Sequence, residues 1–219
     1  LLTEELRQEI NNCTKLVDVE DLYRPFKEKK KTKATEAIKN GLEPLANTIL
    51  EFKNINVELE SKKYLNDNVK TVEDAIQGAK YIIAERISDN ADYRKWIRNY
   101  TFKNSFIISK LKKNAVDEKE VYKIYYDFKD KTYSLKDYRV LAINRGEDEK
   151  ILNVNLDIDT IPIIEYLEKK EIKKNTSEKD IVKDSIIDSY DRLISPSIER
   201  EIRSELTDRA SVGAIRNFQ

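Results

Sequence analysis

The sequence of 219 residues contains no histidine, no methionine and a single cysteine, Cys13. Without histidine, a Ser–His–Asp triad, a Cys–His pair and a zinc site with histidine ligands are excluded. One cysteine can form neither an internal disulfide nor a thiolate metal cluster, and it is typical of a reducing cytoplasm. We therefore expect a cytoplasmic protein that holds no metal and no cofactor, with Cys13 as a small core residue.

Glycine and proline are also scarce, with four of each. They are too few for a many-turned β sandwich or a flexible linker, and the scattered glycines form neither a Walker A loop nor a dinucleotide fingerprint. No apolar run approaches the roughly 18 residues that span a bilayer, and no signal peptide opens the chain. The carboxylates lie mostly on Glu/Lys-rich helical faces. We therefore expect a non-enzymatic protein without a membrane segment.

The length suits one large domain or two small ones, each with its own core. A subdivision is possible near residues 115–130. Because even an initiating methionine is absent, we expect the chain to be part of a longer protein, or a sequence from which methionines have been lost.

The sequence contains 41 basic and 41 acidic residues, so its net charge is zero. Electrostatic binding must then come from local clusters. The densest cluster, which we call the basic segment, spans residues 24–33 and contains Arg24, Lys27, Lys29, Lys30, Lys31 and Lys33. We predict phosphate contacts without sequence choice, because lysine acts as a mobile point charge. The alternative is a solvated loop that only aids solubility. The neighbouring Tyr23 and Phe26 could stack on bases, but an anchoring role in the core or loop is the simpler interpretation.

Helical periodicity predicts a mainly α, multi-helical domain with at most a minor β element. The clearest helix is 71–87, where Thr71 can cap a continuous apolar stripe. The other helices are expected at 3–16, 35–40, 42–52, 89–102, 134–145, 161–172, 181–194 and from 195 onward. The polar stretch 169–179 predicts an exposed connector.

Local residue chemistry predicts where several of these helices end. Gly41 suits the left-handed residue after one helix, and Gly146 is expected to stop another. Ser195 is expected to cap the last helix, with Pro196 at its first position. Alternating glutamate and arginine along that last helix predict ion pairs between residues four apart.

Two stretches favour strands. Residues 151–156 alternate clearly between apolar and polar side chains, but the sequence does not locate the partner that a strand needs. Residues 122–128 also alternate enough to be a strand.

A second candidate site is the compact polar motif Asn144–Glu147, NRGE. Arg139 and Arg145 are six residues apart, close to two helical turns, so together they could bind a phosphate. Alternatively, Arg145 and Glu147 brace a helix C-terminus at which Gly146 supplies the turn. Lys110, Lys112 and Lys113 form a weaker basic cluster. Like the basic segment, it either contacts phosphates or is a solvated surface.

Three blocks of sequence resemble a known family when taken together. They are EDLYRPFKEKKKTKATEAIKNGLEPLA at 20–46, YRVLAINRGE at 138–147 and PSIEREIRSEL at 196–206. In this order they resemble the Tex (toxin expression) family of bacterial transcription accessory proteins. Tyr138 stands where the family usually has histidine, and Phe26 stands where tyrosine is common. The resemblance implies the N-terminal helical region of such a protein. The RNase H-like, helix-hairpin-helix and S1 domains that follow in the family are absent from these residues.

The same resemblance implies a partner, nucleic acid and chiefly RNA, bound mainly through the S1 domain. The present chain would then be a helical scaffold whose basic segment adds secondary phosphate contacts. A different hypothesis is a structural or protein-interaction module that docks on transcription or ribosome-associated machinery without binding nucleic acid. An RNA-processing enzyme is a third, but no catalytic set supports it.

Overall fold

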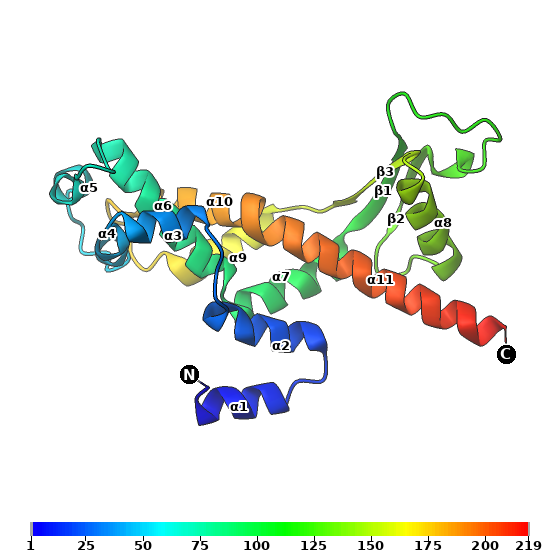
Figure 1. The fold of residues 1–219 in the computed structure, drawn as a ribbon, viewed down its shortest axis with the longest axis horizontal. Helices are drawn as coiled ribbons and strands as arrows, with labels where there is room; N and C mark the ends of the chain where they lie inside the picture. Colours follow the sequence, from blue (N-terminus) through cyan, green and yellow to red (C-terminus); the bar gives the residue numbers. More distant parts are fainter. Residues whose placement is uncertain (1, 219) are drawn as a thin grey trace. The chain divides into compact units, whose positions relative to one another are not determined.

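The computed structural model describes residues 2–218, and it is mainly helical with one small antiparallel sheet (Figure 1). This confirms the predicted fold class. The described residues divide into two compact units, one of residues 2–95 and 161–196 and one of residues 96–160 and 197–218. The possible subdivision near 115–130 lies inside the second unit. Among residues 2–218, no helix is long and apolar enough to cross a membrane.

The first unit is organised around α6 (Val72–Ser88), the helix that the sequence marked most clearly. Its inward face is apolar, with Ala75, Ile82 and Ile83 buried. Thr71 begins the helix as predicted, because its Oγ accepts the Asp74 N–H at 3.1 Å. The helices α3 (Lys33–Lys39), α4 (Glu43–Ile49) and α10 (Lys179–Asp188) pack against α6 (Figure 1). The same unit contains α1 (Glu4–Asn11), α2 (Leu16–Tyr23), η1 (Arg24–Phe26), α5 (Val57–Ser61), η2 (Lys62–Tyr64), α9 (Ile161–Glu171), the π-helical turn η4 (Ser189–Ile194) and the beginning of α7 (Ala91–Asn104).

The junction of α3 and α4 confirms the role predicted for Gly41, which has φ +86°. The Gly41 N–H donates to the Ile38 carbonyl at 3.0 Å, and the Leu42 N–H donates to the Ala37 carbonyl at 3.1 Å. These two bonds form a Schellman motif, in which a left-handed residue satisfies the last carbonyls of the helix. Leu42 is thereby directed onto α6 at Gly78, where a Cβ would overlap its side chain.

The N-terminal helix is shorter than predicted. Thr3 does cap it, accepting the Leu6 N–H at 3.2 Å, but α1 ends at Asn11 and the chain restarts as α2. The intervening asparagine and threonine residues are weak helix formers, and α1 has no buried residue to extend it by packing. Cys13 therefore lies outside the helix and is only half-buried, so its placement in the core was wrong.

The polar connector between α9 and α10 is not uniformly exposed, because Glu178 is fully buried. Its carboxylate accepts the Ile55 N–H at 3.0 Å, the Ser177 hydroxyl at 3.2 Å and the Thr176 hydroxyl. Burial alone would raise the pKa of Glu178, but these hydrogen bonds outweigh it and lower the pKa below its ordinary value. The prediction of an exposed connector is therefore wrong at this residue.

The second unit contains the sheet, whose strand order is β2–β1–β3 with both pairs antiparallel. The predicted strand at 151–156 is confirmed as β3 (Leu152–Asp157), and its missing partner is β1 (Phe106–Leu111), where Ser109 lies opposite Val154. The stretch 122–128 is only partly a strand. It forms the 3-10 turn η3 (Lys123–Tyr125) and then enters β2 (Asp127–Lys131), because Tyr122 and Tyr125, three residues apart, are both buried.

Gly146 does not stop a helix, contrary to the sequence-based prediction. It lies inside α8 (Asp137–Asp148), where a Cβ would come 2.8 Å from Leu152 Cγ and 3.1 Å from Tyr122 Cδ1. The glycine is needed for close packing on β3. The helix ends instead in a Schellman motif at Lys150, which has φ +62°.

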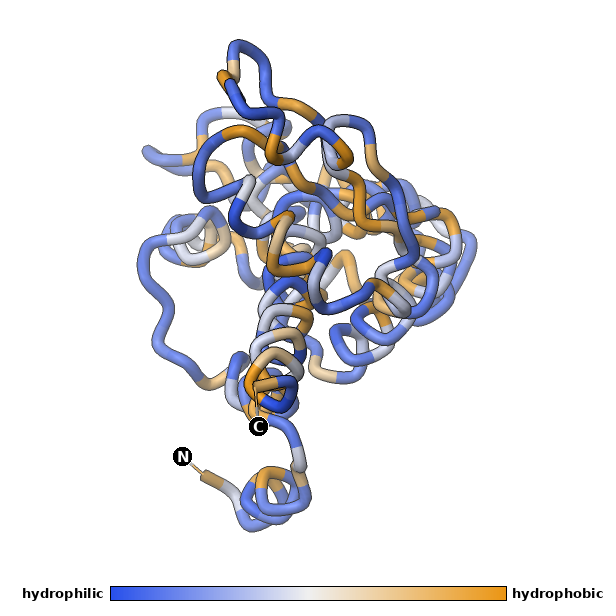
Figure 2. Tube along the Cα trace, turned by 90° about the vertical axis from the view of Figure 1, so that its right-hand side faces the viewer, coloured by the Kyte–Doolittle hydropathy of each residue, from blue (hydrophilic) through white to orange (hydrophobic). Residues whose placement is uncertain are grey.

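The last helix, α11 (Ser195–Asn217), begins differently from the prediction. Ser195 has helical dihedral angles and does not cap. The Ser195 N–H donates to the Tyr190 carbonyl, five residues earlier, so the turn before Pro196 is π-helical. The predicted apolar stripe is confirmed, with Ile198, Ile202 and Leu206 buried. In Figure 2 the helix that ends at the C label accordingly carries both hydrophilic and hydrophobic turns.

Candidate nucleic-acid interface

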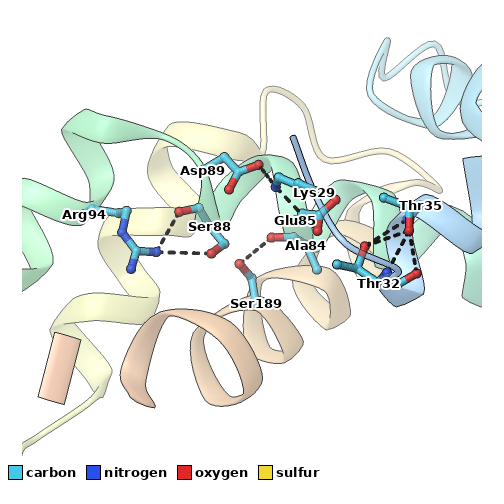
Figure 3. Close-up of polar contacts among 9 residues, drawn as sticks. All are labelled: Lys29, Thr32, Thr35, Ala84, Glu85, Ser88, Asp89, Arg94 and Ser189. Carbon is cyan, nitrogen blue, oxygen red and sulfur yellow. Dashed lines mark hydrogen bonds and ion pairs between the residues drawn. The ribbon is translucent and has the colours of Figure 1, made fainter. Parts of the chain in front are cut away.

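The basic segment begins in η1 and ends at the first residue of α3, and its middle, residues 27–32, is not helical. Upstream, Pro25 lies in the turn η1. Downstream, Thr32 and Thr35 form a reciprocal capping box at the start of α3, in which the Thr35 N–H donates to Thr32 Oγ1 at 3.0 Å and the Thr32 N–H donates to Thr35 Oγ1 at 2.7 Å (Figure 3). Both ends of the segment are therefore fixed by local hydrogen bonding and backbone geometry.

Lys29 is fixed by charge in the middle of the segment. Its ammonium is hydrogen-bonded to Asp89 and lies 3.4 Å from Glu85, both at the end of α6 (Figure 3). Its side chain is only 24 % exposed. Because two carboxylates already surround this cation, we assign Lys29 to holding the segment on α6 and not to binding phosphate.

The remaining lysines of the segment, Lys27, Lys30, Lys31 and Lys33, are all exposed. Lys31 is 84 % exposed and lies 3.9 Å from Glu36, a distance at which an exposed pair contributes little. The Lys33 ammonium lies 5.0 Å from the centre of the Tyr81 ring. Arg24 is half-buried. The structure therefore leaves four cations facing solvent on a segment that is anchored at its centre.

The aromatic residues beside the segment are not core anchors. Tyr23 and Phe26 are 53 % and 56 % exposed, so an anchoring role in the core is wrong for both, and an anchoring role in the loop stays a prediction. Exposed aromatic rings next to lysines are the composition of surfaces on which bases stack.

A pocket of about 580 Å³ adjoins the basic segment. Lys31, Thr32 and Lys33 form one side of it. Its floor consists of the buried Ala37, Leu42, Val69 and Gly78. Its remaining wall includes two carboxylates and four other polar side chains, which are Glu36, Asp74, Asn40, Asn68, Gln77 and Tyr81. The sequence analysis missed this pocket. Gln77 and Tyr81 are four residues apart and so share one face of α6, but only the packing of α3 on α6 brings that face beside the lysines.

Arg139 and Arg145 lie in the second unit and do not form a paired phosphate site. Both belong to α8, where six residues correspond to about 1.7 turns, so the two side chains project about 120° apart. The Arg139 guanidinium lies 3.8 Å from Asp130 and 5.2 Å from the centre of the Phe128 ring. Arg145 is exposed. The structure therefore separates the two arginines.

The NRGE motif instead holds α8 to α11. Arg203 donates to Asn144 Oδ1 and Glu147 Oε1, each at 2.9 Å, and the Asn144 amide donates to Thr207 Oγ1 at 2.9 Å. Arg203 and Arg209 of α11 thus pair with acidic residues of α8, and the ion pairs predicted between residues four apart stay a prediction. Glu201 accepts the Arg98 Nε–H at 2.9 Å.

The first sequence block also has a structural role. Asp21 is buried 3.6 Å from Arg94. Arg94 is itself completely buried and donates to the Ser88 carbonyl at 2.9 Å (Figure 3). Within residues 2–218, no group of three or more acidic or cysteine side chains is arranged to hold a metal ion. The exposed lysines and the adjoining pocket are features of the first unit that the contacts described above do not explain.

Comparison with known proteins places the chain among related sequences. A family described as Tex central region-like matches residues 53–218. The chain is 48 % identical to the uncharacterised protein YdcI of Bacillus subtilis, across 99 % of the chain and 31 % of that protein. It is 29 % identical to the transcriptional accessory protein Tex of Neisseria gonorrhoeae, across 99 % of the chain and 30 % of that protein. It is 30 % identical to the human S1 RNA-binding domain-containing protein 1, across 99 % of the chain and 23 % of that protein. The chain thus spans less than a third of each of these relatives.

Proposed function

Since the chain belongs to the Tex family, we propose that it is the helical scaffold of a nucleic-acid-binding transcription accessory protein of the cytoplasm. Its basic segment adds phosphate contacts, and RNA is the partner we expect. Two relatives support the proposal by name, one as a transcriptional accessory protein and one as an S1 RNA-binding domain-containing protein. In this proposal the chain itself carries no catalytic role.

The observation that carries the proposal is the fixed display of Lys27, Lys30, Lys31 and Lys33. Lys29 is paired with Asp89 and Glu85, so its charge does not face solvent, but these contacts hold the basic segment on α6. A preorganised cationic segment loses less conformational entropy on binding a phosphate chain than a free loop does. Since the chain has no net charge, binding through this segment must be local.

The test is the binding of single-stranded RNA and duplex DNA to the chain across a salt series. Each phosphate contact on a single strand contributes about 0.7 to the slope of log affinity against log salt. The variant Lys27→Gln/Lys30→Gln should therefore weaken binding without sequence preference and lower that slope by about 1.4. The matched control is Lys173→Gln/Lys174→Gln, which removes two exposed lysines from the connector between α9 and α10 in the same unit.

Equal slopes for the two variants would refute phosphate binding by the basic segment. Lys29 is left unchanged in this design, because its substitution would release the segment from α6 and confuse loss of charge with loss of structure.

One observation favours a second candidate, a protein-interaction module. The second unit exposes four aliphatic side chains around the connection between β1 and β2, which are Leu111, Val116, Val121 and Ile124, between 42 % and 72 % exposed. Exposed apolar side chains that gather on one segment mark protein contacts. If the chain binds no nucleic acid near physiological salt, this candidate is favoured, and the partner is to be sought in transcription or ribosome-associated machinery.

A further inference from the structure

We propose that the pocket beside the basic segment receives one unstacked base of the bound nucleic-acid strand. This inference rests on the proposed function, because it assigns a second contact to the same binding surface. Lys31, Thr32 and Lys33 belong both to the basic segment and to the pocket wall. A strand whose phosphates lie along the segment therefore passes the pocket mouth.

The size of the pocket fits this ligand. Its volume of about 580 Å³ lies within the roughly 300–1,000 Å³ of small-molecule sites, which accommodates a nucleobase with part of its sugar. A base that is paired and stacked in a duplex cannot enter a pocket in a protein wall. The pocket therefore admits bases only from a single strand or from an opened duplex.

The pocket lining offers the chemistry that a base requires. Asn68 and Gln77 are exposed at the rim, and each amide supplies both hydrogen-bond donors and an acceptor, which match the mixed edge of a base. Beneath them the floor is apolar, with Leu42 and Val69 buried at 2 % exposure each. A nucleobase can pack its flat apolar face on this floor while its polar edge forms hydrogen bonds with the rim.

Tyr81 provides the aromatic wall. It is half-buried, and both the Lys33 ammonium and the Arg192 guanidinium lie over its ring, 5.0 Å and 5.3 Å from the centre. Arg192 is tied to Asp188 by two hydrogen bonds of 2.9 Å and 2.8 Å, whereas Lys33 is on an exposed, flexible stem. A base can displace Lys33 from the ring, and the ammonium is then beside the phosphate of the same nucleotide.

The test compares two strands with the same number of phosphates, a 12-nucleotide single-stranded RNA and an abasic strand of equal length. The chain should bind the RNA at least about fivefold more tightly, the lower end of the effect of stacking one base on an aromatic ring. The variant Asn68→Ala/Gln77→Ala should lose most of this ratio while keeping its salt slope, and Tyr81→Leu should do the same. Gln8→Ala/Asn99→Ala, which removes two exposed amides elsewhere, should retain the ratio.

The outcomes separate the two proposals. If the RNA-to-abasic ratio persists in the Asn68→Ala/Gln77→Ala variant, whose substitutions are at exposed positions that leave the fold intact, the pocket is not the base site. If the ratio is lost in Tyr23→Leu/Phe26→Leu instead, the bases stack on α2 and η1, and the pocket assignment is again wrong. If neither strand binds, the proposed function itself fails. A duplex that binds as tightly as the single strand at equal salt would also overturn the base pocket.

Discussion

Replacement of the buried Glu178 by glutamine should destabilise the first unit in a manner that depends on pH. The carboxylate is completely buried, and it accepts hydrogen bonds from the Ile55 amide and from the hydroxyls of Thr176 and Ser177. Glutamine has nearly the same shape, so no cavity forms. Its NH2 group, however, must face donors where the carboxylate accepted.

The magnitude follows from these three hydrogen bonds. A bond to a charged acceptor contributes about 1.5–3 kcal/mol, and a neutral one about 0.5–1.5 kcal/mol. The Thr176 hydroxyl can reverse direction and accept from the amide of glutamine. The Ser177 hydroxyl, which also lies 2.5 Å from the Ile55 carbonyl oxygen, can accept from that amide while it donates to Ile55, so part of the loss is recovered. We therefore expect Glu178→Gln to lower the free energy of unfolding at pH 7 by about 2 kcal/mol.

The sign of the pH dependence follows from the lowered pKa of Glu178, whose ordinary value is 4.5. Because the folded carboxyl holds its proton less tightly than the unfolded one, the unfolded state binds more protons as the pH falls. The stabilisation is therefore fully present above about pH 4.5 and is lost as the pH falls through the folded-state pKa. The variant lacks this titration, so the two proteins should converge in stability at acid pH.

The assay is urea unfolding followed by circular dichroism at pH 7 and at about pH 3, with amide exchange at Ile55 as a local measure. The local measure matters because two units need not unfold in one transition. Glu165→Gln, at an exposed residue of α9, is the control and should have little effect. Equal stability of the variant and the wild type at pH 7, or a difference that stays constant down to pH 3, would refute the reasoning.

Two further predictions concern packing and buried charge. Gly146→Ala should destabilise the second unit by about 1 kcal/mol. The overlap with Leu152 and Tyr122 costs about 1–3 kcal/mol, which exceeds the roughly 1 kcal/mol by which alanine stabilises a helix relative to glycine. A variant that is more stable than the wild type in thermal unfolding would contradict this packing. Arg94→Leu should cost about 3–5 kcal/mol, because it leaves Asp21 buried without its cationic neighbour. Urea unfolding of this variant would contradict the prediction if the loss were below about 1 kcal/mol.

Local sequence chemistry determined much of the secondary structure. The stripe of α6 with its Thr71 cap, the left-handed Gly41 and the alternation of β3 are all set by residues within a few positions of one another. The same local patterns failed at Gly146. A glycine permits a helix to end, but Gly146 lies inside the helix because the Leu152 side chain occupies the space that a Cβ would need. The helix ends instead at Lys150.

For the candidate site, the sequence by itself determined where the cations are, and only the tertiary structure decided what each one faces. Lys29 meets Asp89, sixty residues away, whereas Lys30 and Lys31 remain in solvent. The pocket combines residues far apart in the chain, because Leu42 packs on α6 at Gly78 and both line the pocket together with Tyr81. The physical reason is that charge and helical period are properties of neighbouring residues, whereas pairing and cavity shape depend on contacts between residues far apart in the chain.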